Sequence, residues 1–186
     1  MRIVSGELKG RRFHAPDNLP TRPTTDAAKE SLFNILNNHV EWDELRVLDL
    51  FAGIGGISLE FVSRGAELVH AVDNHSGCTR FIGETATKFG VDNLQVFKQD
   101  AFDYLKRCRF RYNMIFADPP YQLPNIASLP DLVLGADCLE PEGIFILEHS
   151  AACNFQQDPR CIEERRYGKV HFSFFRRVDV RPCRIS

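Results

Sequence analysis

The segment Val47-Leu48-Asp49-Leu50-Phe51-Ala52-Gly53-Ile54-Gly55-Gly56 decides the fold of this chain of 186 residues. Its first residues are mostly apolar, as expected of a buried strand. Gly53 and Gly55 then allow a tight turn and a close approach of the backbone to a ligand. A helical pattern follows from about Gly56 to Arg64 and ends at Gly65. A strand that runs through a glycine turn into a helix is typical of a doubly wound α/β sheet, whose ligands bind at the carboxyl edge of the strands.

The same alternation of short apolar strands and helices continues along the chain. Strands are predicted at Arg46 to Leu50, Glu67 to Val72, Asn93 to Lys98, Tyr112 to Ala117 and Gly143 to Leu147. Helices are predicted at about Gly56 to Arg64, Ser76 to Phe89, Phe102 to Arg107 and Pro130 to Asp137. Two further strand-like runs, Cys161 to Arg166 and Lys169 to Val178, are separated only by Tyr167-Gly168 and predict a hairpin. We therefore expect a mostly parallel sheet with helices on both faces and an antiparallel addition at its end.

A basic segment precedes this pattern. Strand-like pieces at Arg2 to Ser5 and Arg11 to His14 flank a glycine-containing turn and predict an N-terminal β-hairpin. After a proline-containing loop, Thr24 or Thr25 can cap a helix that covers Asp26 to Asn38. We expect one compact domain overall, made of a basic arm at residues 1–23 and an α/β domain at residues 24–186.

Composition and length exclude several classes of protein. The longest apolar runs, such as Gly143 to Leu147, are far too short to cross a bilayer. The N-terminus, Met1 to Gly6, lacks the apolar stretch of a signal peptide. The six cysteines have no Cys-x-x-Cys spacing, so we expect reduced thiols and no metal site. These features predict a cytoplasmic protein without a membrane partner.

The formal net charge of -2 hides an uneven distribution. Residues 1–25 carry five basic and two acidic side chains, and residues 160–186 carry eight basic and three acidic ones. The central part of the chain therefore has a net charge of -10. Basic ends around an acidic centre suggest a polyanion at one rim and a cationic or neutral ligand in the middle. An ordinary solvated surface is the alternative explanation.

Three aspartates stand at the ends of successive predicted strands. Asp49 precedes the glycine turn, and Asp73 and Asp100 follow the next two strands. Asp73 lies 20 residues after Gly53, where a carboxylate can bind ribose hydroxyls of a dinucleotide. However, Ser58 replaces the third glycine of the dinucleotide fingerprint, and Asp49 would repel a pyrophosphate. S-adenosylmethionine carries an ammonium and a sulfonium, so we predict that Asp49 faces its amino-acid moiety, Asp73 its ribose and Asp100 its adenine amine.

The segment Asp118-Pro119-Pro120-Tyr121 follows the fourth predicted strand. Its prolines have fixed φ angles and no N–H, so the chain leaves the sheet in a stiff conformation with free carbonyls. The carboxylate of Asp118 and the carbonyl of Pro119 match the two hydrogens of an exocyclic amine on a nucleobase. The ring of Tyr121 offers a stacking surface for a flipped base. The segment therefore indicates methyl transfer to a base amine, although a rigid loop without a ligand has the same sequence requirements.

Taken together, these motifs resemble the RsmD-type family of bacterial methyltransferases, which methylate the exocyclic N2 amine of a guanine in small-subunit (16S) ribosomal RNA. The matching stretches are Met1 to Gly6 with Gly10-Arg11-Arg12, Arg22-Pro23-Thr24-Thr25-Asp26 leading to Lys29 to Asn34, Asp49 to Gly53, Ser63 to Ala66 and Asp118 to Tyr121. The resemblance implies the Rossmann-like fold of class I S-adenosylmethionine-dependent methyltransferases. That fold has a seven-stranded, mostly parallel sheet with an antiparallel C-terminal hairpin.

The resemblance also implies site residues. The implied cofactor site includes Asp49, Phe51, Gly53, Gly55, Asp73, Asp100 and Ala101, to which we add the adjacent Ala52 and Asn74. The target guanine is expected at the catalytic residues Asp118, Pro119, Pro120 and Tyr121, with the loop Arg22 to Asp26 closing over the site. RNA phosphates are expected to contact Arg2, Lys9, Arg11, Arg12 and Arg22. Two further basic stretches, Lys106 to Arg111 and the C-terminal tail, are additional candidates. Ile54 stands where relatives often have serine, which could change one cofactor contact.

Other functions share part of this pattern. A DNA adenine-N6 methyltransferase uses the same Asp-Pro-Pro-Tyr segment, but such enzymes usually carry a target-recognition region for which this chain has no room. A non-catalytic RNA-binding assembly factor would have no need of four aligned aspartates. A dinucleotide oxidoreductase is disfavoured by the acid at the turn. We therefore predict a monomeric enzyme that acts on small-subunit ribosomal RNA or on a 30S assembly intermediate.

Overall fold

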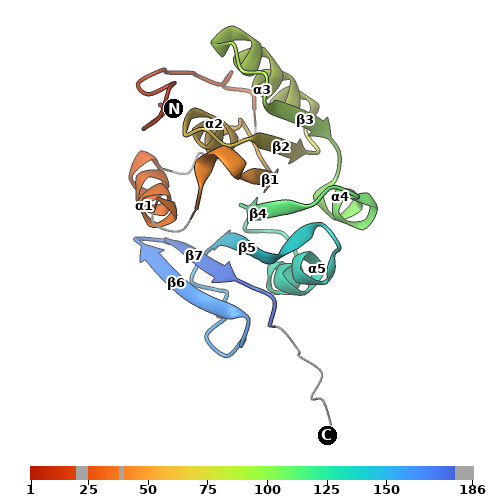
Figure 1. Ribbon diagram of the computed structural model, residues 1–186. Helices are drawn as coiled ribbons and strands as arrows, with labels where there is room; N and C mark the ends of the chain where they lie inside the picture. The colour runs from red at the N-terminus through yellow and green to blue at the C-terminus, as the bar shows by residue number, and fades with distance from the viewer. Residues whose placement is uncertain (20–24, 38–39, 179–186) are drawn as a thin grey trace, which may run out of the picture.

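The computed structural model describes residues 1–19, 25–37 and 40–178. These residues fold around a seven-stranded sheet with strand order β3-β2-β1-β4-β5-β7-β6 (Figure 1). The strands are β1 (Arg46–Leu50), β2 (Leu68–Asp73), β3 (Leu94–Lys98), β4 (Tyr112–Ala117), β5 (Leu139–His149), β6 (Cys161–Tyr167) and β7 (Val170–Phe175). The first five are parallel, whereas β7 pairs antiparallel with β5 and β6 pairs antiparallel with β7. The predicted parallel sheet with a terminal antiparallel hairpin is confirmed.

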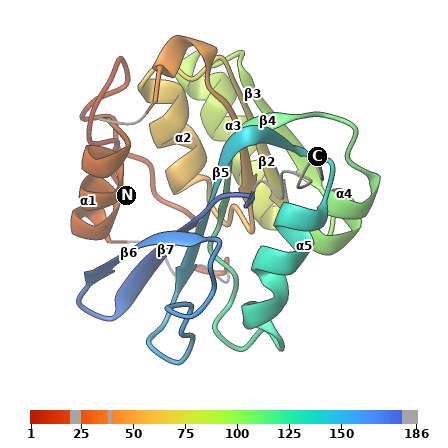
Figure 2. The same cartoon turned by 60° about the horizontal axis from the view of Figure 1, so that its bottom comes forward.

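Five α-helices of the described residues cover the two faces of the sheet. They are α1 (Asp26–Leu36), α2 (Gly56–Ser63), α3 (Ser76–Phe89), α4 (Ala101–Arg107) and α5 (Leu129–Gly135), and the 3-10 turns are η1 (Trp42–Glu44) and η2 (Ile126–Ser128). Helices α1, α2 and α3 lie on one face and α4 and α5 on the other (Figure 2). Within the part of the chain that the structure describes, no helix has the length and apolar character to span a bilayer.

The core is divided into two layers because successive side chains of a strand point to opposite faces. On β1, Val47 packs with the cluster under α1 to α3, and Leu48 packs with the cluster under α4 and α5. On β4, Met114 and Ile115 divide in the same way. Both faces are covered by helices, which explains why these strands appear in the sequence as continuous apolar runs.

The bounds of several elements differ from the prediction. Strand β5 begins at Leu139 and not at Gly143, because Glu140-Pro141-Glu142 interrupts the apolar pattern without ending the pairing. A shift in register between Tyr112 and Met114 accompanies this irregular start. Helix α1 ends at Leu36, and the turn between β6 and β7 is Gly168-Lys169.

The two predicted N-terminal pieces pair with each other: Met1 and Phe13 exchange N–H···O bonds at 2.9 and 3.2 Å, and the N–H of Ile3 donates to the Arg11 carbonyl at 3.0 Å. The pairing is short, an isolated antiparallel bridge of Arg2 with Arg12 in place of two regular strands. The backbone of this segment also bonds to α2: the N–H of Glu7 donates to the Ser63 carbonyl at 2.7 Å, and Gly6 lies so close to Ser63 that a Cβ would sit 1.7 Å from that oxygen. Three apolar side chains of the segment, those of Ile3, Leu8 and Phe13, are buried in the core under α1 to α3. Residues 1–19 therefore form a strap that packs on the domain and does not project from it.

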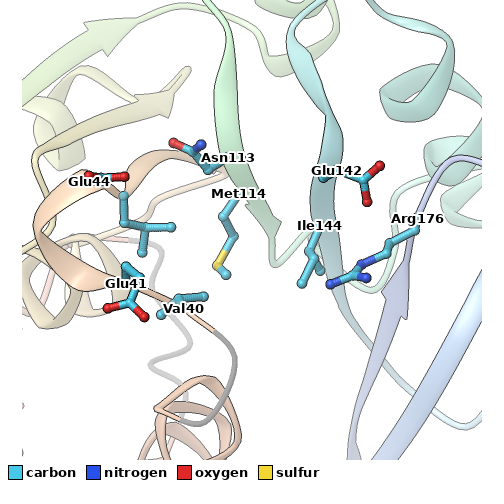
Figure 3. Close-up of a pocket in the computed structure, with 9 residues that line it drawn as sticks. Val40, Glu41, Glu44, Asn113, Met114, Glu142, Ile144 and Arg176 are labelled. Carbon is cyan, nitrogen blue, oxygen red and sulfur yellow. The ribbon is translucent and has the colours of Figure 1, made fainter.

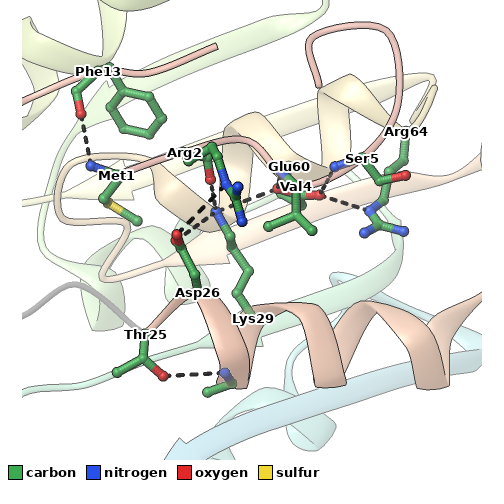
Figure 4. A network of polar contacts seen from close by, with 11 residues as sticks. Met1, Arg2, Val4, Ser5, Phe13, Thr25, Asp26, Lys29, Glu60 and Arg64 are labelled. Atoms are coloured by element: carbon green, nitrogen blue, oxygen red, sulfur yellow. Dashed lines mark hydrogen bonds and ion pairs between the residues drawn. The ribbon is translucent and has the colours of Figure 1, made fainter. Parts of the chain in front are cut away.

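A buried ion network fixes this strap to two helices (Figure 4). The side chains of Lys29 on α1 and Glu60 on α2 are fully buried, and Lys29 Nζ lies 3.4 Å from Glu60 Oε2. Glu60 also accepts hydrogen bonds from the backbone N–H groups of Val4 at 2.9 Å and Ser5 at 3.0 Å. Lys29 Nζ donates to the carbonyl of Arg2 at 2.5 Å. Each buried charge therefore has several partners, which offsets its desolvation.

The Glu60→Gln substitution tests this network. It removes the buried counter-charge of Lys29 and leaves only the carboxylate of Asp26, 4.0 Å from Nζ and 47% exposed, and breaking a buried ion pair costs about 3 to 5 kcal/mol. We expect a loss of that size in the free energy of unfolding, measured by urea denaturation. Asp137→Asn is the control, because Asp137 is 82% exposed in its pair with Arg111 and should contribute less than about 1 kcal/mol. Equally small losses in both variants would contradict a structural role for the network.

Candidate active site

The carboxyl ends of β1, β2 and β4 meet at one edge of the sheet. Strand β1 lies in the middle, with β2 on one side and β4 on the other. The chain crosses from β1 to β2 in one direction and reaches β4 on the opposite side, so this is the point where the strand order reverses. A crevice for a ligand is expected at that point in open α/β sheets, as the glycine turn predicts.

The glycine turn after β1 has an unusual backbone. Gly53 and Gly55 have φ angles of +55° and +78°. Gly55 also packs so closely against Ile82 that a Cβ on it would lie 2.9 Å from that side chain. Phe51 also has a positive φ, 60°, which is uncommon for a residue with a side chain. The N–H of Ala52 donates to the carbonyl of Val72 at 3.0 Å, and this bond ties the turn to β2.

Asp73, the last residue of β2, bonds through one carboxylate oxygen to the glycine turn and through the other to the residues that follow β2. Oδ2 accepts a hydrogen bond from the N–H of Gly53 at 2.8 Å, and Oδ1 accepts one from the N–H of His75 at 2.8 Å. Each carboxylate oxygen has a second lone pair, so both can also accept bonds from a ligand. Asn74 follows at the exposed surface.

Asp49 lies behind the turn and is 1% exposed. The hydroxyl of Ser58 donates to its Oδ2. Burial raises the pKa of Asp49 from 3.8 to about 7, the Ser58 hydrogen bonds oppose this shift, and the negative charge of Asp73 adds slightly to it. The sequence indicates Asp49 but not its partner. Ser58 is two residues into α2, and its only signal in the sequence is its place at the third position of the glycine fingerprint.

Asp100 comes beside Asp73 because the N–H of Gln99 donates to the Asp73 carbonyl at 3.0 Å. The carboxylate of Asp100 caps α4 and accepts from the N–H groups of Phe102 at 2.9 Å and Asp103 at 3.1 Å. Ala101, the first residue of the helix, is buried. The ring of Phe51 packs edge-on against that of Phe102, with 6.0 Å between centroids. An acid and two aromatic rings are thus grouped at the ends of β1 and β3.

The Asp118-Pro119-Pro120-Tyr121 segment leaves β4 directly beside the glycine turn. The N–H of Asp118 donates to the carbonyl of Leu50 at 3.4 Å, and the N–H of Leu123 closes a turn on the carbonyl of Pro120 at 2.8 Å. Among the described residues, no backbone N–H donates to the carbonyl of Pro119. Asp118 is half-buried and interacts with other groups of the chain, as does Tyr121, which is 37% exposed.

The N-terminal strap lines the same edge. A Cβ atom on Gly56 would lie only 2.1 Å from the terminal methyl group of Met1. A Cβ atom on Gly77 would lie 2.6 Å from a methyl group of Leu19. Both glycines are in the first turn of a helix that starts at this edge, α2 and α3. In the sequence, the only signal of these contacts is a glycine near the start of each helix.

The predicted RNA-binding residues do not all lie together. Arg2 and Arg12 pair across the bridge near Met1, and Arg2 Nε lies 3.9 Å from Asp26. Lys9 belongs to the turn that contacts the far end of α2, and the guanidinium of Arg11 lies over Phe89 at the end of α3.

Two other basic regions are placed only in part. Residues 106–111 lead from the end of α4 to the start of β4 at the amino edge of the sheet, which is opposite to the candidate site. The structure does not describe residues 22–24 of the predicted closing loop, which include Arg22, nor residues 179–186 of the tail.

A pocket of about 200 Å³ lies at the amino edge (Figure 3). Its lining includes Glu44 before β1, Asn113 on β4, Glu142 on β5 and Arg176 after β7. The Nε of Arg176 is buried and has no hydrogen-bond partner among the described residues. Because the pocket opens at the edge opposite to the glycine turn, it is separate from the aspartates described above.

Comparison with known structures identifies the fold. The Escherichia coli structure named "Putative methyltransferase yhhF" superposes with a TM-score of 0.83 at 26% identity, over 95% of this chain and 97% of that one. The Thermus thermophilus 16S rRNA N2 G1207 methyltransferase, solved with AdoMet and guanosine, has a TM-score of 0.68 at 17% identity, over 86% of this chain and 45% of that one. The predicted Rossmann-like class I methyltransferase fold is confirmed.

Comparison of sequences identifies the family. The Bacillus subtilis protein named "Putative rRNA methyltransferase YlbH" is 36% identical over 153 residues, which are 80% of this chain and 82% of that protein. The Escherichia coli ribosomal RNA small subunit methyltransferase D is 28% identical over 148 residues, 80% of this chain and 74% of that protein. The family model described as conserved hypothetical protein 95 matches residues 1–176. The chain therefore belongs to this family, the RsmD-type methyltransferases that its motifs indicate.

Proposed function

We propose that this protein transfers a methyl group from S-adenosylmethionine to the exocyclic N2 amine of a guanine in small-subunit ribosomal RNA. The observation that carries the proposal is the hydrogen bond between the N–H of Asp118 and the carbonyl of Leu50, because it places the acceptor segment directly beside the glycine turn. The names of the relatives support ribosomal RNA as the substrate, and the small-subunit name supports the 16S molecule.

The buried Asp49 supports a cationic cofactor. A carboxyl that is fully buried and titrates near pH 7 lowers the stability of the protein when it ionises, and a ligand with an ammonium group offsets that cost. S-adenosylmethionine supplies a methyl group on a positively charged sulfur. Asp49 then faces the amino-acid moiety, and Asp73 accepts bonds from ribose hydroxyls. Asp100 and Phe51 bind the adenine, and Ala52, Gly53, Gly55, Asn74 and Ala101 complete the site.

The Asp118 segment orients the base that is methylated. The carboxylate of Asp118 and the carbonyl of Pro119 accept the two amine hydrogens, which turns the nitrogen lone pair toward the methyl group. Pro120 keeps the segment rigid, and the exposed ring of Tyr121 stacks on the flipped base. Alignment of this kind is worth roughly 7 to 11 kcal/mol. Asp118 is also placed to assist loss of the proton after transfer, although a strong general base is unnecessary.

The N-terminal strap supplies part of the RNA-binding surface. Arg2 and Arg12 lie near Met1 and so beside the start of α2, within reach of RNA bound at the carboxyl edge. Lys9 and Arg11 extend this basic surface toward the far end of α2 and α3. The enzyme acts as a cytoplasmic monomer on ribosomal RNA or on a 30S assembly intermediate.

The Asp118→Ala substitution tests the chemistry. Transfer of labelled methyl from S-adenosylmethionine is measured to small ribosomal subunits, protein-free ribosomal RNA and DNA in parallel. We expect label in guanine of ribosomal RNA with the wild-type protein, and a loss of at least about 100-fold with the variant because the amine is no longer aligned. The variant should still bind the cofactor, and Asp137→Ala, at an exposed position, should keep full activity. Label in DNA adenine would overturn the RNA assignment, and an active Asp118→Ala would overturn the mechanism.

The pH dependence of stability tests the environment of Asp49. Because burial raises its pKa to about 7, the folded protein keeps a proton that the unfolded chain releases above about pH 4. The contribution of Asp49 to the free energy of unfolding is therefore fully present below about pH 4, and it is lost as the pH rises to about 7. Each unit of pKa difference corresponds to about 1.4 kcal/mol. The ligand-free Asp49→Asn variant should match wild type near pH 4 and exceed its stability by up to about 4 kcal/mol at pH 8, in denaturant titrations.

Asp137→Asn serves as the matched control for that comparison. Its carboxylate is exposed, so its difference from wild type should not change between pH 4 and pH 8. A constant difference between Asp49→Asn and wild type over the same range would show that Asp49 is ionised throughout and would contradict the proposed environment.

The salt dependence of RNA binding tests the strap. Removing both charges in Arg2→Gln/Arg12→Gln should reduce the slope of log Kd against log salt by about 1.4, since each single-strand phosphate contact contributes about 0.7. Fluorescence anisotropy with a small-subunit RNA fragment measures both slopes. The control is Lys106→Gln/Arg107→Gln, which removes the same charge from the end of α4. A larger change of slope in the control would show that RNA binds at the opposite edge.

A further inference from the structure

The register of β4 and β5 places a second carboxylate beside Asp118. Phe116 pairs with Ile146 and Ala117 with Leu147 in this parallel ladder. The next position on β4 is Asp118, whose N–H still bonds to β1, and the next position on β5 is Glu148. The two acids therefore stand at neighbouring strand ends on the edge that holds the glycine turn.

The side chains of the two acids also lie on the same face of the sheet. Phe116 and Ile146 belong to the core under α1 to α3, whereas Ala117 and Leu147 belong to the core under α4 and α5. Side chains alternate along a strand, so Asp118 and Glu148 continue the side of Phe116 and Ile146. Asp49 lies on that side too, because it pairs with Phe116 across β1 and β4.

Glu148 is far more buried than an ordinary acidic side chain at the protein surface. It is 3% exposed, and its neighbour on β7 is the fully buried Phe172. Ionised side chains are rarely buried without a specific partner. Asp118 and Glu148 both interact with other groups of the chain, and a carboxylate has about four lone-pair sites, so such an interaction is compatible with an additional donor from a ligand.

The chemistry of guanine calls for a second acceptor next to the first. The N2 amine has two hydrogens, which the proposed function assigns to Asp118 and Pro119, and the adjacent ring atom N1 carries a third. Adenine has a lone pair at the ring nitrogen next to its amine. A carboxylate at this position accepts the N1–H of guanine and repels the lone pair of adenine.

We propose that Glu148 is a specificity-determining residue that accepts the N1–H of the target guanine. This inference rests on the proposed function and deepens it, because it assigns the choice of guanine to a residue that the sequence motifs do not include. Asp118 is the outer, half-buried carboxylate and Glu148 the inner one, so a base that presents its edge to Asp118 brings N1 to Glu148. A desolvated acceptor discriminates strongly, since the wrong base leaves it unpaired.

The test compares guanosine with 2-aminopurine riboside. Both carry the amine at C2, but 2-aminopurine has a lone pair at N1 in place of N1–H. Binding to the protein loaded with S-adenosylhomocysteine is measured by calorimetry, and methyl transfer is measured with RNA in which 2-aminopurine replaces the target guanosine. We expect the wild-type protein to prefer guanine by at least about tenfold in both measurements.

The Glu148→Gln variant should bring this preference to within about threefold, because an amide can accept from N1–H or donate to an N1 lone pair. The absence of O6 from 2-aminopurine affects both proteins alike, so the change in the ratio isolates N1. Glu148→Asp, which keeps the acceptor, should retain more of the preference than Glu148→Gln. Glu142→Gln, at an exposed position on β5, is the matched control and should leave the ratio unchanged.

Three results would overturn the inference. The wild-type protein could show no preference for guanine over 2-aminopurine, or a folded Glu148→Gln could keep the wild-type ratio of the two bases. The third is an equal loss of binding and methyl transfer for both bases in Glu148→Gln, which indicates a purely structural role. Thermal denaturation of each variant establishes that it is folded. If wild type labels guanine N2 and the ratio does not respond to Glu148→Gln, only this inference fails. If wild type labels adenine, the proposed function fails, whatever Glu148 does.

Discussion

The carboxylate of Asp73 makes the interaction on which the site depends. It accepts hydrogen bonds from Gly53 and His75, both at 2.8 Å, and so joins the end of β2 to the turn after β1. Together with the bond from the N–H of Ala52 to the carbonyl of Val72, it stabilises the positive φ angles of the turn, which are intrinsically unfavourable at Phe51. The same turn follows Leu50, whose carbonyl accepts from Asp118. The glycine turn and the Asp118 segment are therefore positioned by hydrogen bonds that link the ends of β2, β1 and β4.

The buried ion network extends this framework to the N-terminus. Glu60 lies on the helix that begins at the glycine turn, and it bonds to Lys29, to Arg64 and to two backbone groups of the strap. The helix that starts at the glycine turn thus also anchors the N-terminal strap, whose Met1 side chain lies against Gly56 at the start of that helix. The cost of burying these charges is offset only when every partner is present, so the strap is fixed in one position relative to the turn.

The sequence predicts the sheet well because both of its faces are covered and its strands are uninterrupted apolar runs. It fails where bonding is not local. The pieces at Arg2 to Ser5 and Arg11 to His14 pair with each other, as their composition predicts. Val4 and Ser5 also bond to Glu60, and the turn between the pieces bonds to Ser63 on α2, which no local pattern reveals. The aspartates of the site are predicted because each lies at or near the end of a predicted strand. Glu148 is the penultimate residue of β5, but it follows the predicted boundary at Leu147, and its burial depends on β7, an antiparallel neighbour whose position follows from the whole fold.

The uneven charge of the chain has a physical cause in this arrangement. Parallel strands end at one edge, so acids placed at their ends accumulate there. Burial raises the pKa of Asp49 at this edge, and the negative charge of the nearby Asp73 adds to the shift. A protein selected only for stability would lose that carboxyl, whereas a protein that binds a cation and base donors at this edge gains from it. The acidic edge and the basic strap beside it are therefore complementary parts of one surface, the first suited to the donors of the cofactor and the base and the second to the phosphates of RNA.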